Sequence, residues 1–226
     1  MKLIVISNSE KLAAEDDIIV KMFADRSKEE PVIVTKMFEN GLLNFHLRKP
    51  GCSPKELKDY IERIPEHFHN RIVLHSHHQL AGKYSLKGIH ISKSDKKKEF
   101  KNWLKFKLLK IKNPQTILTT SFSRASKIFE EEYNISYHYV FLTPIFNNLT
   151  GELQSGYQEN TLKSIMGRTD HKVIARGGVT TDKVKQIHDI GFSGMAVHST
   201  IWRKEDPLAE FIAFKNKFNE LNIELE

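Results

Sequence analysis

The stretch from Lys172 to Trp202 constrains the fold of this chain more than any other. It begins with the apolar run Val173–Ala175, which predicts a short buried strand. A helix is expected next, from a cap at Thr180–Asp182 to Gly191, and a second apolar run at Gly194–His198 predicts another strand. Two strands joined by a helix of this length are parallel, because the crossover returns the chain to the same end of the sheet. The stretch is therefore a βαβ unit.

Both strand ends of this unit carry groups that suit an anion. Gly177 and Gly178 let backbone N–H groups approach a ligand closely, and Ser199 and Thr200 offer hydroxyls at the next strand end. A glycine pair after one strand and a small hydroxyl turn after the next are typical of the phosphate site on the last two strands of a (β/α)8 barrel. The alternative is a turn that needs glycine for steric reasons alone.

The rest of the chain repeats this alternation. Further strands are expected at 3–6, 42–47, 71–75, 86–91, 116–120 and 137–142, and helices at 15–25, 31–40, 53–64, 79–84, 99–110, 123–133, 161–166 and 207–221. Residues 26–30 are charged and predict a loop, and Ser53 with Glu56 predicts a capping box. Eight strands alternating with crossovers predict one α/β domain over 1–226, a closed (β/α)8 TIM barrel. No Gly-x-Gly-x-x-Gly follows the first strand, which argues against a dinucleotide-binding sheet.

Composition and charge limit the compartment and the classes of binding partner expected for this chain. The single cysteine, Cys52, excludes a disulfide within the chain, and no apolar run approaches the roughly 18 residues of a membrane span, so a cytoplasmic protein is expected. The net charge is +7, and nine lysines lie between 93 and 112, interleaved with aromatic residues. We interpret that segment as an amphipathic helix with a lysine-coated outer face rather than a nucleic-acid site. A basic chain suits small phosphorylated substrates.

Polar side chains gather where the predicted strands end, which is where the chemistry of such barrels is placed. They are His46, Arg48 and Lys49; His75; His90 and Asp95; Ser121; Thr150; and Arg176, His198, Ser199 and Thr200. The predicted mouth is cationic and rich in hydroxyls, with Asp95 as its one obvious carboxylate. A bound polyphosphate fits this set better than a hydrolase with two carboxylates.

Several of these residues admit a plainer interpretation. Arg48 could form a surface salt bridge, Asp95 and Ser121 could cap helices, and His90 could be a packed core residue. His46, His75, His90 and His198 could together bind Zn²⁺ or a similar ion if all four point inward, or they could alternate between the barrel interior and the helices.

Five segments together resemble the thiamine phosphate synthase family, which also contains a thiazole tautomerase paralogue. They are Phe45–Lys49, Gly88–Ile91 with Asp95, Thr120–Ser123, Tyr139–Phe146, and the stretch of the seventh and eighth strands. The resemblance implies a (β/α)8 barrel that joins an aminopyrimidine methyl diphosphate to a thiazole phosphate and releases diphosphate, with Mg²⁺ as cofactor. It leaves a homo-oligomer open, and it implies neither a nucleic-acid partner nor a membrane.

Site roles follow from the matching positions. The resemblance assigns Arg48 and Ser121 to the diphosphate, and Asp95 to Mg²⁺. It assigns Thr150 to the thiazole region, and Gly177, Gly178 and Ser199, with Thr200 beside them, to the thiazole phosphate. His46, Lys49, His75, His90, Arg176 and His198 are further candidates for the mouth.

The chain also departs from the family pattern. His46 stands where the family has glutamine, and His75-Ser76 stands where it has Asn-Asp, which removes the second Mg²⁺ carboxylate. Gly151 stands where the family has a lysine that contacts the diphosphate. The tautomerase has a histidine near the position of Pro144, where this chain has proline. Two alternatives therefore stay open: a Mg²⁺-independent, tautomerase-like enzyme on a thiazole or another small phosphorylated compound, and a non-catalytic binder of phosphate esters.

Overall fold

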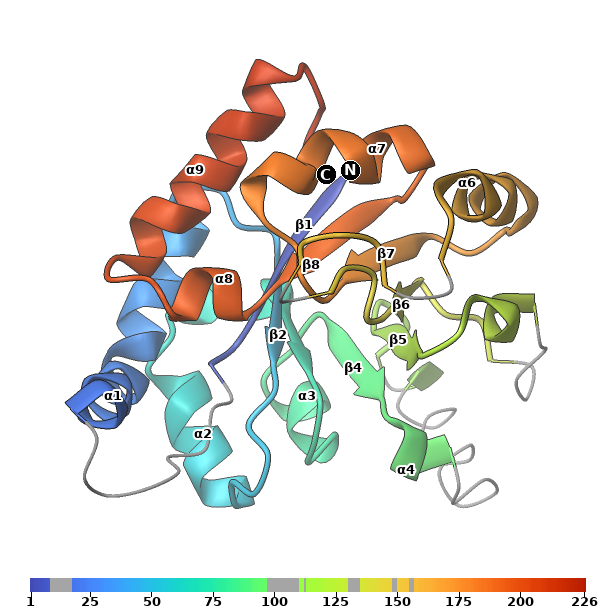
Figure 1. Ribbon diagram of the computed structural model, residues 1–226. Helices are drawn as coiled ribbons and strands as arrows, with labels where there is room; N and C mark the ends of the chain where they lie inside the picture. Colours follow the sequence, from blue (N-terminus) through green and yellow to red (C-terminus); the bar gives the residue numbers. More distant parts are fainter. Residues whose placement is uncertain (9–17, 97–109, 112, 130–134, 148–149, 155–156) are drawn as a thin grey trace.

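The computed structural model describes the chain except for residues 9–17, 97–109, 112, 130–134, 148–149 and 155–156. Eight parallel strands close into a barrel in sequence order, and helices surround it (Figure 1). The strands are β1 (Lys2–Ile6), β2 (Asn44–Leu47), β3 (Ile72–Leu74), β4 (Gly88–Ile91), β5 (Ile117–Phe122), β6 (Tyr139–Leu142), β7 (Val173–Arg176) and β8 (Gly194–Val197). The predicted TIM barrel is confirmed, and each predicted strand is present within a few residues of its expected bounds.

The outer layer consists of α-helices and short 3-10 turns. The α-helices are α1 (Ile18–Glu39), α2 (Pro54–Glu62), α3 (Gln79–Lys83), α4 (Lys93–Lys96), α6 (Glu159–Arg168), α7 (Val184–Ile190), α8 (Ser199–Trp202) and α9 (Pro207–Glu220). The 3-10 turns are η1 (Glu66–Arg71), η2 (Ala125–Phe129) and η3 (Thr181–Lys183). In the part of the chain that is described, no helix combines the length and the apolarity needed to cross a bilayer.

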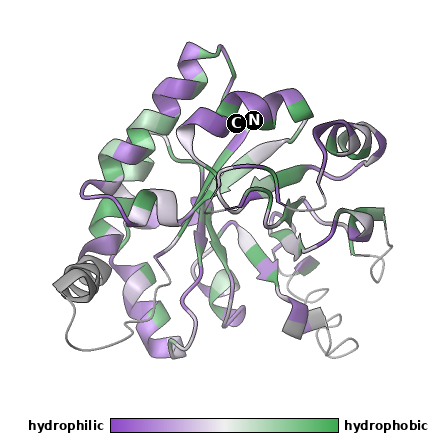
Figure 2. Ribbon diagram, in the orientation of Figure 1, coloured by the Kyte–Doolittle hydropathy of each residue, from purple (hydrophilic) through white to green (hydrophobic). Residues whose placement is uncertain are grey.

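Side chains that alternate along each strand divide the core into two layers. One set, including Val5, Leu47 and Val197, packs outward against the helices in a large apolar cluster. The other set points into the barrel, where a smaller cluster contains Ile6, Phe141 and further apolar residues of β1 and β6–β8. The strands are largely apolar in Figure 2, while the helices combine both colours, as expected for helices that cover a barrel with one face.

The first crossover differs from the prediction. A loop was expected at 26–30 with a new helix at Pro31, yet α1 continues through both, with Pro31 inside it. The charged segment does not end the helix because one of its carboxylates, Glu30, is fully buried and paired. Val34, Met37 and Phe38 then bury the last turns against the barrel. Proline weakens a helix at one position, and this burial outweighs the loss.

The other helices follow the sequence to different degrees. Ser53 and Glu56 form the predicted capping box at α2. Where a helix was expected at 123–133, the described part, up to Phe129, forms only the 3-10 turn η2, and the rest of the expected helix lies largely outside the described residues. Nearly all of the basic segment 99–110 also lies outside the described residues. Thr180 does not cap the next helix, because its hydroxyl donates to Asp182 and the chain enters α7 through η3.

Candidate active site

Polar side chains occupy one side of the barrel interior. Apolar residues fill the side formed by β1 and β6–β8. On the opposite side, β2, β4 and β5 contribute His46, His90 and Thr119, all buried. The position after β3 contributes His75, which is partly exposed. Because interior positions alternate along a strand, these side chains share the register of the apolar set and face the barrel axis.

Three of the four predicted histidines meet at this place. Ligand atoms of His46, His75 and His90 all lie within 4.8 Å of one another. His46 Nδ1 is 2.9 Å from His75 Nε2, and the rings of His75 and His90 stack with centroids 4.1 Å apart. The fourth predicted histidine, His198, lies just after β8 before α8 and is not a member of this group.

Hydroxyl groups surround the cluster. His46 Nε2 lies 2.6 Å from the Tyr139 hydroxyl. His90 Nδ1 lies 2.9 Å from Thr119 Oγ1, and His90 Nε2 lies 3.1 Å from Ser121 Oγ. The Thr119 hydroxyl can donate to the Ile89 carbonyl, so it can accept from His90 Nδ1–H while Ser121 donates to Nε2. The Ser121 hydroxyl thus forms its hydrogen bond with His90 of the cluster instead of capping a helix.

His46 and His75 are held in their neutral forms. Burial lowers the pKa of His46 and of His75 well below the usual range, and neighbouring histidine and arginine charges lower both further. Burial raises the pKa of the Tyr139 hydroxyl, so that group stays protonated. Neutral imidazoles can exchange protons or ligate a metal ion.

Two arginines add positive charge next to the cluster. Burial lowers the pKa of Arg176, at the end of β7, to about 10, and the Arg48 charge contributes to that shift. The Arg176 guanidinium carbon lies 6.0 Å from the centre of the Phe141 ring inside the barrel. A pKa of about 10 keeps the guanidinium charged at neutral pH, so both arginines suit a bound anion.

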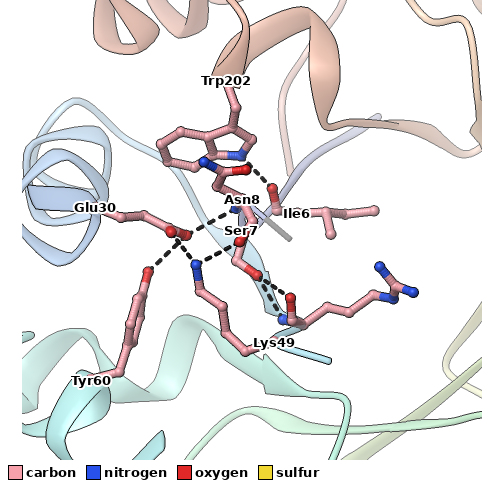
Figure 3. A network of polar contacts seen from close by, with 8 residues as sticks. Ile6, Ser7, Asn8, Glu30, Lys49, Tyr60 and Trp202 are labelled. Atoms are coloured by element: carbon pink, nitrogen blue, oxygen red, sulfur yellow. Dashed lines mark hydrogen bonds and ion pairs between the residues drawn. The ribbon is translucent and has the colours of Figure 1, made fainter. Parts of the chain in front are cut away.

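The backbone of Arg48 is fixed by a buried polar network (Figure 3). Ser7 Oγ donates to the Arg48 carbonyl and accepts from the Arg48 N–H, both at 2.8 Å. The Lys49 ammonium pairs with the buried Glu30 carboxylate, which also accepts from the Tyr60 hydroxyl at 3.0 Å. Lys49, a predicted mouth residue, therefore points toward α1 and away from the histidines.

A second polar region is a cleft of about 580 Å³ over the ends of β7 and β8. Its lining includes four predicted residues, Thr150, Gly178, Ser199 and Thr200. The cleft also contains cationic side chains that the sequence did not single out, namely Lys183, Arg203 and Lys204. Two carboxylates, Asp182 and Glu210, also line the cleft, and Asp182 lies 3.6 Å from the Lys183 ammonium. The three cations outnumber them, and together with the hydroxyls they form a set that suits a phosphate group.

The glycine pair is required by the backbone and by a close approach. Gly177 has φ +93° and Gly178 has φ +67°, both in the left-handed region. A Cβ on Gly178 would lie 2.7 Å from the Phe146 Cβ and 2.8 Å from its carbonyl oxygen. Steric and backbone demands therefore account for glycine at both positions, and Gly178 also lines the cleft. Thr200 instead donates its hydroxyl to the Val179 carbonyl at 2.6 Å.

Asp95 forms the capping box of α4. Its Oδ2 accepts from the Ser92 N–H at 3.0 Å and from the Ser92 hydroxyl at 2.5 Å, while the Asp95 N–H donates back to Ser92 Oγ at 3.3 Å. Among the described residues, the histidine cluster is the only set of three side chains grouped closely enough for a metal ion. The donor atoms of this cluster are imidazole nitrogens, whereas Mg²⁺ prefers oxygen ligands.

Sequence reasoning missed two contributors to the centre of the barrel. Tyr139 and Phe141 both belong to the segment Tyr139–Phe146 that carries the resemblance, but the sequence gives neither a role in the site. The alternation Tyr139–Phe141 along β6 was the available signal, because it places both rings on the face that looks into the barrel. Glu30 was missed because a charged segment before a proline is typical of a loop.

Comparison with known proteins points to one family. The family model described as "Thiamine monophosphate synthase" matches residues 18–201. The thiamine-phosphate synthase of Clostridium beijerinckii is 24% identical over 188 residues, which cover 82% of this chain and 86% of that protein. The crystal structure of thiamine phosphate pyrophosphorylase from Bacteroides thetaiotaomicron superposes with a TM-score of 0.70 at 25% identity, covering 97% of this chain and 98% of that one. The Pyrococcus furiosus thiamine phosphate pyrophosphorylase has a TM-score of 0.69 at 16% identity, a likeness of fold.

Proposed function

Because this chain belongs to the thiamine monophosphate synthase family, we propose that it is a transferase of the thiamine phosphate synthase type. It would join an aminopyrimidine methyl diphosphate to a thiazole phosphate and release diphosphate. The observation that carries the proposal is the pairing of two cationic regions over one barrel mouth, the arginines Arg48 and Arg176 and the cleft over β7 and β8. Two anionic substrates need two such regions. A cytoplasmic location accompanies this function.

The cleft would hold the thiazole phosphate. Gly178 contributes a backbone without a side chain, Ser199 contributes a hydroxyl, and Lys183 contributes a cation. A phosphate ester placed there extends its ring toward Arg176, which ends β7 directly before the glycine pair. Fixing the ring in this way orients the thiazole nitrogen toward the second substrate, which reduces the entropic cost of bringing the two reactants together.

Arg48 and Arg176 would stabilise the diphosphate as it leaves. The bond between the methylene carbon and the diphosphate oxygen breaks, and its electron pair departs with the diphosphate. The lone pair of the thiazole nitrogen then forms the new C–N bond to the same carbon. Guanidinium groups at the strand ends would stabilise the developing negative charge through charge-assisted hydrogen bonds. No proton has to be removed from the attacking nitrogen.

The Mg²⁺ that the family resemblance implies would find few protein donors among the described residues, and substrate oxygens and water would have to complete its coordination. Asp95 is one carboxylate, and it already accepts two hydrogen bonds from Ser92. The strand that precedes it, β4, and its neighbours β3 and β2 present imidazoles. Mg²⁺ requires near-octahedral oxygen coordination and binds imidazole poorly. The roles proposed above therefore rest on arginine, lysine and backbone groups alone.

The test is a synthase assay with matched arginine variants. We expect thiamine phosphate to form from the two substrates, and we expect Arg48→Ala to lower the turnover at least about 100-fold through lost stabilisation of the diphosphate. Arg63→Ala, which removes an exposed arginine of the helix layer, is the control and should retain turnover. Wild-type protein that binds thiazole phosphate but forms no product would refute the synthase proposal.

A second candidate is proton transfer on a thiazole phosphate bound in the same cleft, favoured by the neutral histidines. Thiazole phosphate incubated in D₂O would then gain deuterium on carbon, and His75→Gln would abolish the exchange. Absence of exchange in the wild-type protein would exclude this candidate.

A further inference from the structure

The three histidines inside the barrel form a donor set that neither the phosphate cleft nor the arginines explain. His46 and His90 lie within strands and His75 follows one directly, so three neighbouring strands of a rigid barrel position their rings. Their donor atoms lie within 4.8 Å of one another. Three imidazoles on rigid elements are the protein ligands found in catalytic zinc sites of the carbonic anhydrase type.

The distances approach those of a coordinated ion. With Zn–N bonds of about 2.0–2.1 Å in tetrahedral geometry, two ligand nitrogens lie about 3.3 Å apart. His46 Nδ1 and His75 Nε2 are 2.9 Å apart, so they need to separate by only a few tenths of an ångström. The His90 ring stacks on the His75 ring at an interplanar angle of 17°, so it has to rotate about its side-chain torsions to direct a nitrogen at the same ion.

Groups that would orient the ligands are already in place. If His46 binds through Nδ1, its Nε2–H can donate to the Tyr139 hydroxyl 2.6 Å away. His90 has Thr119 at Nδ1 and Ser121 at Nε2, so whichever nitrogen binds the ion, the other retains a hydroxyl partner. Metal-bound histidines nearly always have such a partner on their second nitrogen, because it fixes the tautomer and the ring orientation.

We propose that His46, His75 and His90 form a binding site for one divalent transition-metal ion of the zinc class, with a fourth coordination position open to the barrel mouth. His46 and His90 are buried, while His75 is partly exposed, so the open position lies on the side of His75. The charges of Arg48 and Arg176 act on His75 and disfavour a bare cation there. They favour an anionic oxygen as the fourth ligand, so metal and anion would bind together.

The site discriminates between metals by the chemistry of its donors. Imidazole is a good ligand for Zn²⁺, Co²⁺ and Ni²⁺, whereas Mg²⁺ prefers carboxylate and water. The inference depends on these three side chains and not on the synthase reaction, so the two proposals succeed or fail separately.

The experiment uses the full chain freed of metal with a chelator and titrated with Co²⁺ and Zn²⁺. We expect one equivalent of Co²⁺ to give the intense visible absorption of a tetrahedral site, and Zn²⁺, but not excess Mg²⁺, to abolish it. His75→Gln should weaken binding at least about 100-fold, while His67→Gln, which changes an exposed histidine, should bind as the wild type does.

Two results would overturn the proposal. One is wild-type protein that binds no Co²⁺ or Zn²⁺ at micromolar concentration. The other is equal affinity in His75→Gln, which would place the bound ion at surface histidines. X-ray absorption of the zinc-loaded wild-type protein gives a readout that does not depend on folding of the variant. Three nitrogen ligands at about 2.0–2.1 Å are expected, and a sulfur ligand from Cys52 would contradict the assignment.

Discussion

At the scale of single residues, the carboxylate of Glu30 is a buried charge held by several partners. It is fully buried, pairs with the Lys49 ammonium, and accepts from the Tyr60 hydroxyl and the Asn8 N–H, each at 3.0 Å. Burial raises the pKa of Glu30, and the Lys49 charge opposes that shift. The network lies beside the position where Ser7 holds the Arg48 backbone, so it supports the mouth without touching a ligand.

Replacing this carboxylate should therefore be costly. Glu30→Ala leaves the Lys49 ammonium buried without its partner, and removing one member of a buried ion pair typically costs about 3–5 kcal/mol. We expect urea unfolding to show a loss of that order in the free energy of unfolding. The adjacent Glu29→Ala, which changes an exposed side chain of the same helix, should alter it by less than about 0.5 kcal/mol. Similar small losses in both variants would contradict the role assigned to Glu30.

The sequence could not reveal this residue, because its environment comes from three separate segments. Glu30, Lys49 and Tyr60 share no motif, and their approach depends on how α1 and α2 pack on the barrel. His46 and His90 were easier to find, since short strands in a predicted barrel place alternate residues inside. What the sequence left open was whether the histidines point the same way, and the register of the strands decides that point.

At the scale of elements, local sequence signals predicted most of the helices and strands. They failed where tertiary burial outweighed the local preference. The capping box at Ser53 and the glycine that ends α7, Gly191 with φ +97°, were identified from residue type alone. The continuous helix α1 was not, because Pro31 and its charged neighbours are local signals of a break. The cationic lining of the cleft was missed because Lys183 and Arg203 belong to different crossovers.

The turn after β7 offers a test at this scale. Gly178→Ala would place a Cβ against Phe146 in a backbone with positive φ, so we expect a loss of about 1–3 kcal/mol in unfolding free energy. Thermal stabilisation by thiazole phosphate should also disappear, since the cleft has to shift. Gly167→Ala is the matched control, because nothing lies within 4 Å of its Cβ. That helical substitution should stabilise the protein by about 0.5–1 kcal/mol. Retained ligand binding in Gly178→Ala would show that the turn does not shape the cleft.

At the scale of the whole molecule, the two ends of the barrel serve different purposes. The candidate site occupies the carboxyl ends of the strands, while the opposite end carries Lys2, Arg71 and Lys87 just before or at strand starts. There, Lys87 donates to the Leu43 carbonyl at 3.0 Å and to Asn44 Oδ1 at 2.5 Å. Groups at this end of a barrel contribute to stability rather than to catalysis.

The titration of Lys87 tests that division. Burial, with the charges of Lys2 and Arg71, lowers the pKa of Lys87 to about 8. Its pKa in the unfolded chain is about 10.4, so between those values the unfolded state binds more protons and stability rises with pH. From pH 8 to 9.5, we expect the wild type to gain about 1 kcal/mol relative to Lys87→Met, discounted for partial exposure. Below about pH 7, where Lys87 is protonated in both states, the difference should be constant. Lys55→Met, an exposed control, should show no such change, and both variants should retain ligand binding.

The polar and apolar sides of the barrel interior also bear on how such a chain can be altered. The cleft lies over the ends of β7 and β8, and the histidine cluster belongs to β2–β4, so these two polar regions come from separate halves of the sequence. Under the proposed function, residues of the first half could be exchanged while the cleft over β7 and β8 is kept. The same separation would let new side chains be introduced on β2–β4 to test other reactions on substrates that still bind in the cleft over β7 and β8.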